Sequence, residues 1–167
     1  MLIQLKNKEN LKFRDFIIKC SIGKNGIKKR RVEGDKTTPK GIFSFLKIYY
    51  RKDRVQKPLS KLKTKIITKN MGWCNDPKSK KYNKLVNLPF NYSYEQLFKK
   101  ENVYDIILVL TYNMNPVKKD KGSAIFIHVA KKYYKRTQGC VAVKKSDLLK
   151  ILREIKINTK VKIEHQK

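Results

Sequence analysis

The chain has 167 residues, of which 40% are hydrophobic and 10% aromatic, so it is long and apolar enough for one domain with a core and is not a disordered basic tail. Its 42 Lys and Arg outnumber 13 Asp and Glu, and the formal net charge of +29 permits contact with nucleic acid, anionic lipid or another acidic polymer. The basic residues are spread through every segment, so we interpret them as a solvated surface and expect no specific nucleic-acid partner.

Neither a membrane span nor a signal peptide is expected from the sequence. No apolar run approaches the roughly 20 residues that a spanning helix needs. Residues 1–20 mix charged and apolar residues and contain no signal-peptide core.

The N-terminal part divides into a lead and the start of a sheet. Residues 1–11 are weakly patterned and are predicted to be a polar lead to one domain over residues 12–164. Residues 12–22 alternate loosely between apolar and polar, which favours a strand. Cys20 lies inside that strand and is interpreted as core packing.

A hairpin is predicted next. Residues 23–26 end in Asn-Gly, the strongest short hairpin signal, and residues 27–32 are predicted to return as a basic strand. Residues 33–41 are rich in Gly, Asp, Thr and Pro, which turns require. Residues 42–50 are predicted to be a strand.

The middle of the chain holds its only tryptophan. A short strand is predicted at residues 66–68, and residues 70–77 then place Trp73 beside Cys74 among turn residues. Trp73 can wall a binding pocket, or it can belong to a satellite hydrophobic cluster under a long loop. The sequence leaves both interpretations open.

Two elements are predicted between this loop and residue 110. Residues 93–100 read as a short helix with Ser93 as N-cap and Gln96 completing a capping box. Residues 106–110 are continuously apolar and are predicted to be a central strand covered on both faces.

The C-terminal part contains a second helix and a last strand. Ser146 is predicted to cap a helix whose apolar residues follow helical spacing and form one core-facing stripe. These residues are Leu148, Ile151, Leu152 and Ile155. A strand over residues 161–163 follows, so the sequence predicts a mainly β domain with about eight strands and two helices.

The chemistry concentrates in one stretch near residue 130. Residues 124–129 are apolar except for His128 and are predicted to be a buried strand. After a basic, aromatic loop, Gly139 permits an unusual turn and Cys140 opens a second short strand. A Cys and a His at the ends of adjacent strands can meet, and a thiol beside an imidazole is expected to become a nucleophilic thiolate at neutral pH.

Cys140 and His128 can also be ordinary residues of the core. A lone Cys or His is usually a satisfied core residue. The other histidine, His165, lies in the last three residues, so His128 is the candidate base. The three cysteines form no CxxC motif and no Cys/His pair at metal-ligand spacing, so neither a metal nor a cofactor is expected.

Four ordered segments resemble the L,D-transpeptidase (YkuD-like) family of peptidoglycan-crosslinking enzymes. The residues from Gly122 to His128, followed by Thr137-Gln-Gly-Cys140, are similar to its catalytic signature, and Glu33 to Gly41 is similar to its Gly-Asp-x-x-Thr-Pro-x-Gly loop. The other two segments match one branch of the family, namely Gly72-Trp-Cys-Asn-Asp-Pro77 with Tyr82-Asn83, and Tyr104-Asp105. The resemblance covers nearly the whole chain and implies an L,D-transpeptidase-like β-sandwich.

The resemblance also implies a reaction. Cys140 would attack the carbonyl of the third residue of a peptidoglycan stem peptide and expel the terminal D-alanine, with His128 as general acid and base. Backbone N–H groups around Gly139 and Cys140 would hold the oxyanion. An amine of another stem would then complete a crosslink between third residues, or water would make the enzyme a carboxypeptidase.

Further expectations follow from the resemblance. Asp35, Thr38, Trp73 and Gln138 are the expected substrate-binding residues, carbapenem β-lactams are expected covalent inhibitors, and the cell envelope is the expected location. Many members carry a His before the Gly-Cys pair and an Arg two residues after the Cys. Here Gln138 and Ala142 occupy those positions, and Lys144 or Arg136 is the candidate replacement for the Arg. The rival functions are a basic nucleic-acid-binding module without catalysis and a thiol hydrolase acting on another peptide or amide.

Overall fold

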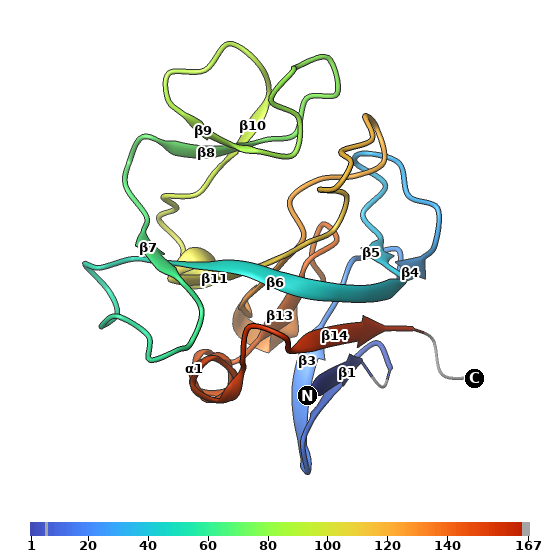
Figure 1. The fold of residues 1–167 in the computed structure, drawn as a ribbon, viewed down its shortest axis with the longest axis vertical. Coiled ribbons are helices and arrows are strands. Elements are labelled where there is room, and N and C mark those ends of the chain that lie inside the picture. Colours follow the sequence, from blue (N-terminus) through green and yellow to red (C-terminus); the bar gives the residue numbers. More distant parts are fainter. Residues whose placement is uncertain (6, 165–167) are drawn as a thin grey trace.

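A computed structural model describes residues 1–5 and 7–164 of the protein (Figure 1). The fold is mainly β, as predicted, with one α-helix and two 3-10 turns among the described residues. The elements in chain order are β1 Leu2–Leu5, β2 Asn10–Phe13, β3 Phe16–Ser21, β4 Ile27–Lys28, β5 Thr38–Pro39, β6 Gly41–Tyr50, β7 Thr64–Ile66, β8 Met71–Cys74, β9 Leu85–Asn87, β10 Tyr94–Gln96, η1 Asn102–Tyr104, β11 Ile106–Leu110, β12 Phe126–Val129, η2 Lys132–Tyr134, β13 Val141–Val143, α1 Lys145–Glu154 and β14 Lys160–Ile163.

The main sheet closes on itself because two strands each join its two halves. Its strand order is β11-β12-β13-β3-β2-β1-β14-β6-β7, and β6 also pairs with β11. The first residues of β6 pair with β14 and its later residues with β11, while β3 pairs with β2 on one side and β13 on the other. The two halves face each other as the layers of a sandwich and enclose the larger core.

Strand alternation divides the residues near the candidate site between two cores. Ile106 and Leu108 of β11, with Ile127 of β12, point into the core between the sheet halves. Their neighbours Ile107 and Phe126 point outward into a second cluster. Because both faces are covered, β11 is apolar at every position, which confirms the prediction of a central strand over residues 106–110.

The second cluster lies between the outer face of this half and a small sheet of order β10-β8-β9. Figure 1 shows these three green strands on the opposite side of β6 and β11 from helix α1. Trp73 of β8 packs edge-on against Phe126 with 5.3 Å between ring centroids. The site residues are therefore held beneath an added layer of the fold.

Helix α1 covers the inner core from the other side. Leu148, Ile151 and Leu152 are buried, as their spacing predicts, and Ile155 is buried just after the helix. The predicted cap is wrong, because the helix begins one residue before Ser146 and its N-cap is Lys144, which makes no side-chain capping bond. Burial of the apolar stripe, rather than a cap, stabilises this helix.

The N-terminal expectations need correction. Residues 1–11 are not a separate lead, because β1 pairs in parallel with β14 and antiparallel with β2. The single strand predicted over residues 12–22 is instead the hairpin β2–β3, which turns at Arg14, a residue with φ +53°. The alternation of apolar and polar residues continues through the turn at Arg14, so the sequence pattern does not reveal the turn.

The predicted hairpin after residue 22 is wrong in its pairing. The N–H of Gly26 does bond to the carbonyl of Gly23, so a tight turn forms. The returning residues of β4, however, pair in parallel with β5 and not with β3, because both edges of β3 are already occupied by β2 and β13.

The helix predicted over residues 93–100 is a strand. Residues Tyr94–Gln96 pair antiparallel with β8, and the side chain of Gln96 donates to the carbonyl of Lys69 instead of capping a helix. Ser93 Oγ likewise donates to the side chain of Asn75. Pairing with a neighbouring strand outweighs the local helix signal. The strand predicted at residues 66–68 lies two residues earlier, at β7.

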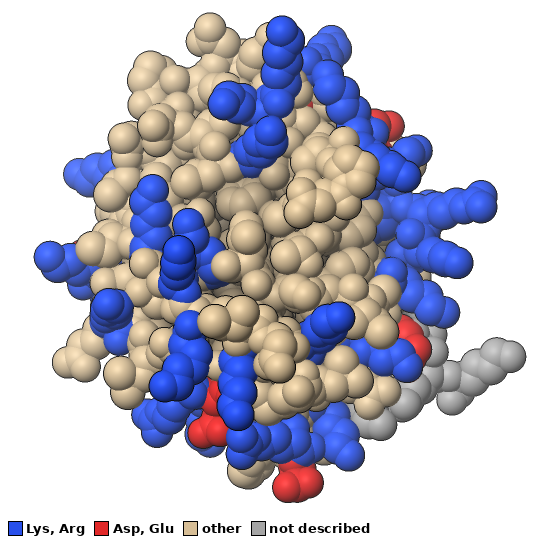
Figure 2. All heavy atoms as spheres, in the orientation of Figure 1, with Lys and Arg blue, Asp and Glu red and all other residues tan. Residues whose placement is uncertain are grey.

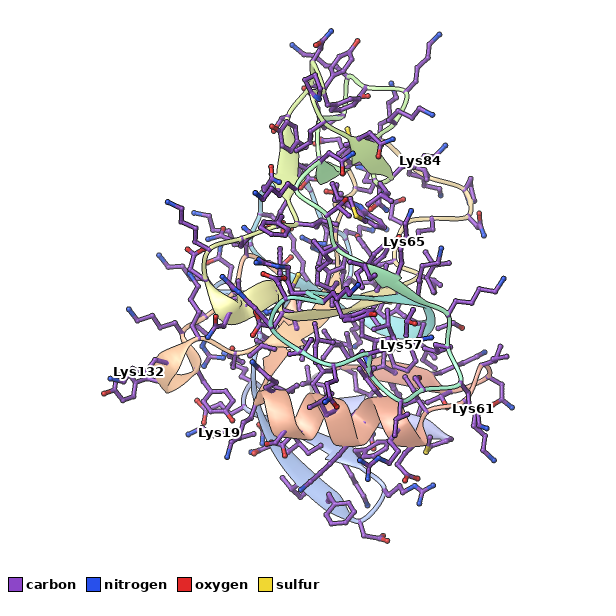
Figure 3. All side chains as sticks on the ribbon, turned by 90° about the vertical axis from the view of Figure 1, so that its left-hand side faces the viewer. Lys19, Lys57, Lys61, Lys65, Lys84 and Lys132 are labelled. Carbon is purple, nitrogen blue, oxygen red and sulfur yellow. The ribbon has the colours of Figure 1, made fainter. Side chains whose placement is uncertain are left out.

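The positive charge is distributed over the surface. Figure 2 shows Lys and Arg side chains along most of the margin of one face and few acidic ones. The lysines labelled in Figure 3, among them Lys19, Lys65 and Lys84, project from separate parts of the fold. Within residues 1–5 and 7–164, no helix is long and apolar enough to cross a bilayer.

Candidate active site

Cys140 and His128 lie on one face of two adjacent strands. Strands β12 and β13 are parallel, with His128 opposite Ala142. Side chains two residues apart on a strand share a face, so Cys140, two residues before Ala142, lies diagonally across from His128. Both are nearly buried, at 8% and 7% exposure. The two side chains therefore share one face of this half of the sheet. His165 lies outside the described residues.

The cysteine is held as a neutral thiol, which corrects the expected thiolate. Its Sγ donates to the carbonyl of Ala124 at 3.1 Å and accepts from the N–H of Phe126 at 3.3 Å. Burial raises the pKa of Cys140 to about 12. Among the described residues no hydrogen bond joins Sγ to His128, so the imidazole does not stabilise a thiolate in the free protein.

The imidazole of His128 is also neutral. Burial lowers its pKa, and Nδ1 lies 2.9 Å from the carbonyl of Val129. A carbonyl only accepts, so this contact places the proton on Nδ1 and leaves Nε2 with a lone pair. The ring of Tyr104 packs edge-on at 5.4 Å and fixes the orientation of the imidazole. His128 is thus prepared to accept a proton.

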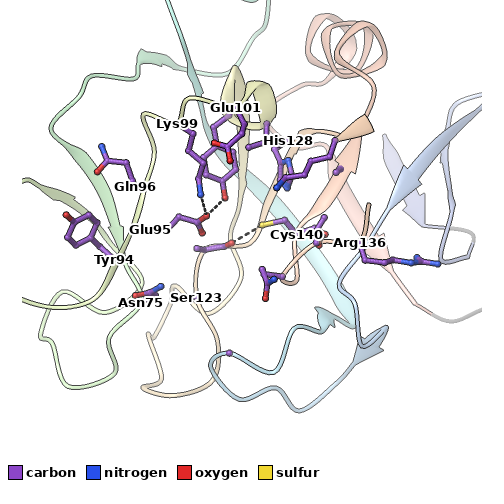
Figure 4. Close-up of a pocket in the computed structure, with 18 of the residues that line it drawn as sticks. Asn75, Tyr94, Glu95, Gln96, Lys99, Glu101, Ser123, His128, Arg136 and Cys140 are labelled. Atoms are coloured by element: carbon purple, nitrogen blue, oxygen red, sulfur yellow. Dashed lines mark hydrogen bonds and ion pairs between the residues drawn. The ribbon is translucent and has the colours of Figure 1, made fainter. Parts of the chain in front are cut away.

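A cavity of about 540 Å³ opens over this pair. Its walls come from the 31–34 loop, β10 and the residues after it, the Ser123–Ala124 segment and the loop from Lys131 to Gln138. Figure 4 shows Glu95, Lys99, His128 and Cys140 around it. A cavity of this size accommodates a small peptide segment.

Acidic groups line the same cavity although the chain is strongly basic. Glu95 accepts a hydrogen bond from Tyr104 Oη at 2.7 Å and pairs with Lys99 Nζ at 3.0 Å. Burial, followed by the nearby Glu95 charge, raises the pKa of Tyr104. The pair of Glu95 and Lys99 supplies both signs of charge near His128.

Gly139 adopts a conformation that only glycine readily takes. Its φ is +136°, and a Cβ there would lie 2.8 Å from the carbonyl oxygen of Thr37. Its N–H donates to Thr137 Oγ1 at 3.1 Å. In the described part of the chain the N–H of Cys140 has no such partner, so of the two expected oxyanion donors it is the free one.

The 33–41 loop supports the site from behind. Thr38 is fully buried and donates to the carbonyl of Gly139. Asp35 accepts bonds from Thr37 and Val32, and these, with the Arg31 charge, outweigh partial burial and hold the pKa of Asp35 below its usual value. Neither Asp35 nor Thr38 lines the cavity, whereas Gln138 does.

Trp73 belongs to the second hydrophobic cluster and does not line the cavity. Its Nε1 donates to Asn83 Oδ1, which also accepts from the N–H of Ala124, both at 3.0 Å. Ala124 has φ +51°, a strained value for alanine, and its carbonyl receives the Cys140 thiol. Asn83 therefore positions the backbone on which the thiol rests.

Sequence reasoning missed several cavity residues, chiefly Arg31, Glu95 and Ser123. Arg31 lies in the run Lys28-Lys-Arg-Arg31, where nothing distinguishes it from its exposed neighbours. Glu95 fell in the segment predicted to be a helix. The one feature of the sequence that could have singled out Glu95 is its charge, because acidic residues are rare in this chain.

The two residues considered as replacements for the missing Arg are placed differently. Lys144 is exposed and does not line the cavity. Arg136 lies at the cavity rim, where its guanidinium bonds to the carbonyl of Lys8 and faces Glu9. Across residues 1–5 and 7–164, no cluster of three His, Cys, Asp or Glu side chains could hold a metal ion.

The fold and the site together define a mainly β domain that holds a Cys and a His at the floor of a peptide-sized cavity. Residues 2–163 match the model of the YkuD family, the L,D-transpeptidase catalytic domain. The chain therefore belongs to this family, whose function concerns peptidoglycan, and the resemblance inferred from the sequence is confirmed.

Among solved structures, the chain is similar to the helical cell shape determining protein Pgp2 from Campylobacter jejuni. The TM-score is 0.52 at 17% identity, and the match covers 99% of this chain and 48% of that one. At this identity the likeness shows the fold, and the chain spans about half the length of that protein. A comparison with curated proteins finds no match.

Proposed function

We propose that the protein is a cysteine-dependent L,D-transpeptidase that acts on peptidoglycan stem peptides through a thioester on Cys140. The observation that carries this proposal is the placement of Cys140 and His128 on one face of adjacent strands at the floor of the cavity. Family membership supports peptidoglycan as the substrate. The expected location is the cell envelope, where that polymer lies.

Because the Cys140 thiol and the His128 imidazole are both neutral, the thiol has to lose its proton during the attack on the substrate. Substrate binding displaces the thiol from the carbonyl of Ala124, and Nε2 of His128 takes the thiol proton as Sγ attacks the carbonyl of the third stem residue. The N–H of Cys140 stabilises the oxyanion. The imidazolium then protonates the nitrogen of the D-alanine, the C–N bond breaks, and the acyl group remains on Sγ.

The second half of the reaction reverses these roles. An incoming amine loses a proton to His128 and attacks the thioester, and the thiol of Cys140 recovers that proton on release. The product is a crosslink between third stem residues. With water as the nucleophile the product is a shortened stem, which is carboxypeptidase activity. The basic surface helps to retain the enzyme near anionic envelope polymers.

The test is a reaction of the purified protein with disaccharide tetrapeptides, followed by mass spectrometry of the products. We expect free D-alanine together with a crosslinked dimer, a tripeptide product, or both. The variant Cys140→Ser should form neither, while Cys74→Ala, which changes a buried thiol outside the cavity, should retain activity. Absence of product and of an acylated Cys140 in the wild type would refute the proposal.

A further inference from the structure

Two polar atoms beside the cavity are buried without a hydrogen-bond partner among the described residues: Nη1 of Arg31 and Oγ of Ser123. Both residues line the cavity, and they are 4% and 6% exposed. Leaving a buried donor unpaired is unfavourable, and more so when it is charged. Two such atoms in one place need an explanation, and a ligand that completes their bonds is one.

The guanidinium of Arg31 lies between the two backbone segments that carry Ser123 and Cys140. A Cβ on Gly122 would be 2.7 Å from Nη1, and a Cβ on Gly139 would be 3.2 Å from Nη2. Gly122 immediately precedes Ser123, and Gly139 immediately precedes Cys140. Glycine at both positions makes room for the guanidinium beside the residue that precedes the nucleophile.

Part of this guanidinium is engaged and part is free. Nε bonds to Thr37 Oγ1 at 3.2 Å, and both Nε and Nη2 approach Asp35 Oδ1, at 3.4 and 3.3 Å. The guanidinium also lies over the ring of Tyr112, 5.3 Å from its centroid, but within the described part of the chain Nη1 makes no hydrogen bond. Each N–H of Nη1 can donate a charge-assisted hydrogen bond to a carboxylate oxygen, and a serine hydroxyl can donate to the same anion. The chemical partner of this pair is a carboxylate.

We propose that Arg31 and Ser123 form the subsite for the C-terminal carboxylate of the acyl donor, the carboxylate of the residue that is released. This inference rests on the proposed function for its choice of ligand. The subsite is a closed end, because the Arg31 side chain is only 2% exposed, so it receives the end of a peptide and not a continuing chain.

The distance along the substrate agrees with this position. The carboxylate of the released residue lies one residue beyond the scissile carbonyl, which is roughly 3.5 Å along an extended chain. Arg31 contacts the glycine adjacent to the nucleophile, which is the neighbourhood that this spacing requires. Nη1 is covered in the free protein, and a Cβ on Gly122 would lie only 2.7 Å from it, so binding has to shift the Gly122–Ser123 segment. Among the described residues no hydrogen bond of Ser123 Oγ opposes that shift.

Binding to the variant Cys140→Ser tests the subsite without turnover. The probes are a diacylated lysyl-D-alanine dipeptide with a free C-terminal acid and the same dipeptide as its C-terminal amide, titrated by calorimetry. We expect the acid to bind at least tenfold more tightly than the amide. Adding Arg31→Gln should remove that preference, and adding Ser123→Ala should reduce it several-fold. Adding Arg30→Gln, the same charge change on an exposed neighbour, should leave it intact.

The outcomes separate the two proposals. Equal binding of acid and amide to Cys140→Ser, or a preference that survives Arg31→Gln, would overturn the carboxylate subsite. Loss of the preference only in Arg30→Gln would also overturn it. Ser123→Ala keeps the test valid if Arg31→Gln unfolds, because removing Ser123 Oγ breaks no hydrogen bond within the part of the chain that the structure describes. If the acid binds more tightly than the amide through Arg31, but the wild type forms no acyl-enzyme, only the proposed reaction is refuted and the carboxylate subsite stands.

Discussion

The hydroxyl of Thr38 donates a 2.8 Å hydrogen bond to the carbonyl oxygen of Gly139 and accepts one of 2.9 Å from the N–H of Gly23. The Gly139 carbonyl and the Cys140 N–H belong to one planar peptide and point in opposite directions. Fixing the oxygen on the loop side therefore aims the Cys140 N–H away from the loop. A threonine about 100 residues earlier in the chain thus sets the direction of the candidate oxyanion donor.

Thr38→Val should lower both stability and reactivity. The variant keeps the shape of the side chain but leaves the Gly23 N–H and the Gly139 carbonyl without their partner, at about 1–3 kcal/mol of unfolding free energy. We expect this loss in urea unfolding, together with slower acylation of Cys140. Thr68→Val, on an exposed threonine whose hydroxyl donates to the side chain of Asn70, should change the free energy of unfolding by less than about 0.5 kcal/mol and leave the acylation rate unchanged. Unaltered acylation in Thr38→Val would show that this hydrogen bond does not orient the site.

Gly139→Ala should abolish acylation and destabilise the fold. The added Cβ would lie 2.8 Å from the backbone of Thr37, which cannot move as a flexible side chain does, and φ is +136°. Gly26→Ala is the matched control, since it also has positive φ, +81°, but has open space around it, so it should cost only about 1–2 kcal/mol and keep activity. Thermal unfolding and acylation of both variants give the comparison. Equal effects would mean that Gly139 matters only through its backbone conformation.

The thiol of Cys140 should react slowly with a small alkylating agent at neutral pH. Burial raises its pKa to about 12, so its thiolate fraction grows about tenfold for each pH unit up to that value. The iodoacetamide rate, measured on Cys20→Ala/Cys74→Ala, should rise through pH 10 without a plateau. A rate that levels off near pH 7 would contradict the neutral thiol and support the thiolate that the sequence suggested.

The same shift affects stability with a definite sign. Below about pH 9 the thiol is protonated in both the folded and the unfolded protein, so its contribution is constant. Between about 9 and 12 only the folded protein keeps the proton, and the free energy of unfolding falls as the pH rises. Cys140→Ala should reduce the slope of that decline in denaturant titrations.

The features predicted well are those that depend on neighbours in the chain. The apolar runs of β11 and β12 and the stripe of α1 carry their own periodicity, and Cys140 and His128 lie where two adjacent strands begin and end. Residues 93–100 were mispredicted because pairing with β8, about twenty residues earlier, decides their conformation.

The state of the site could not be read from the sequence for a related reason. A Cys next to a His suggests a thiolate, but the carbonyl of Ala124 and the cluster around Phe126 keep the thiol neutral. Arg31 is buried only because the fold brings two glycines, Gly122 and Gly139, against its guanidinium. Such placements depend on contacts between distant segments, which local patterns do not record.

A carbapenem should acylate Cys140 and neither of the other cysteines. The thiol adds to the lactam carbonyl, the ring C–N bond breaks, and the ring nitrogen takes the proton through His128, so the protein gains the mass of the whole inhibitor. Cys140 lines the cavity, whereas Cys20 lies in the main core and Cys74 donates toward the carbonyl of Asp76, and neither lines it.

Intact-mass spectrometry and peptide mapping of four proteins test this selectivity. The wild type and Cys74→Ala should each gain one adduct, on the peptide that contains Cys140, while Cys140→Ser should gain none. His128→Ala should be labelled on the order of 100-fold more slowly, because general-base assistance contributes roughly 10²–10⁴ in rate. An adduct on Cys74, or labelling of Cys140→Ser, would move the reactive site. Undiminished labelling of His128→Ala would remove the histidine from the mechanism, because the buried thiol would then lose its proton without the Nε2 that we assign as its acceptor.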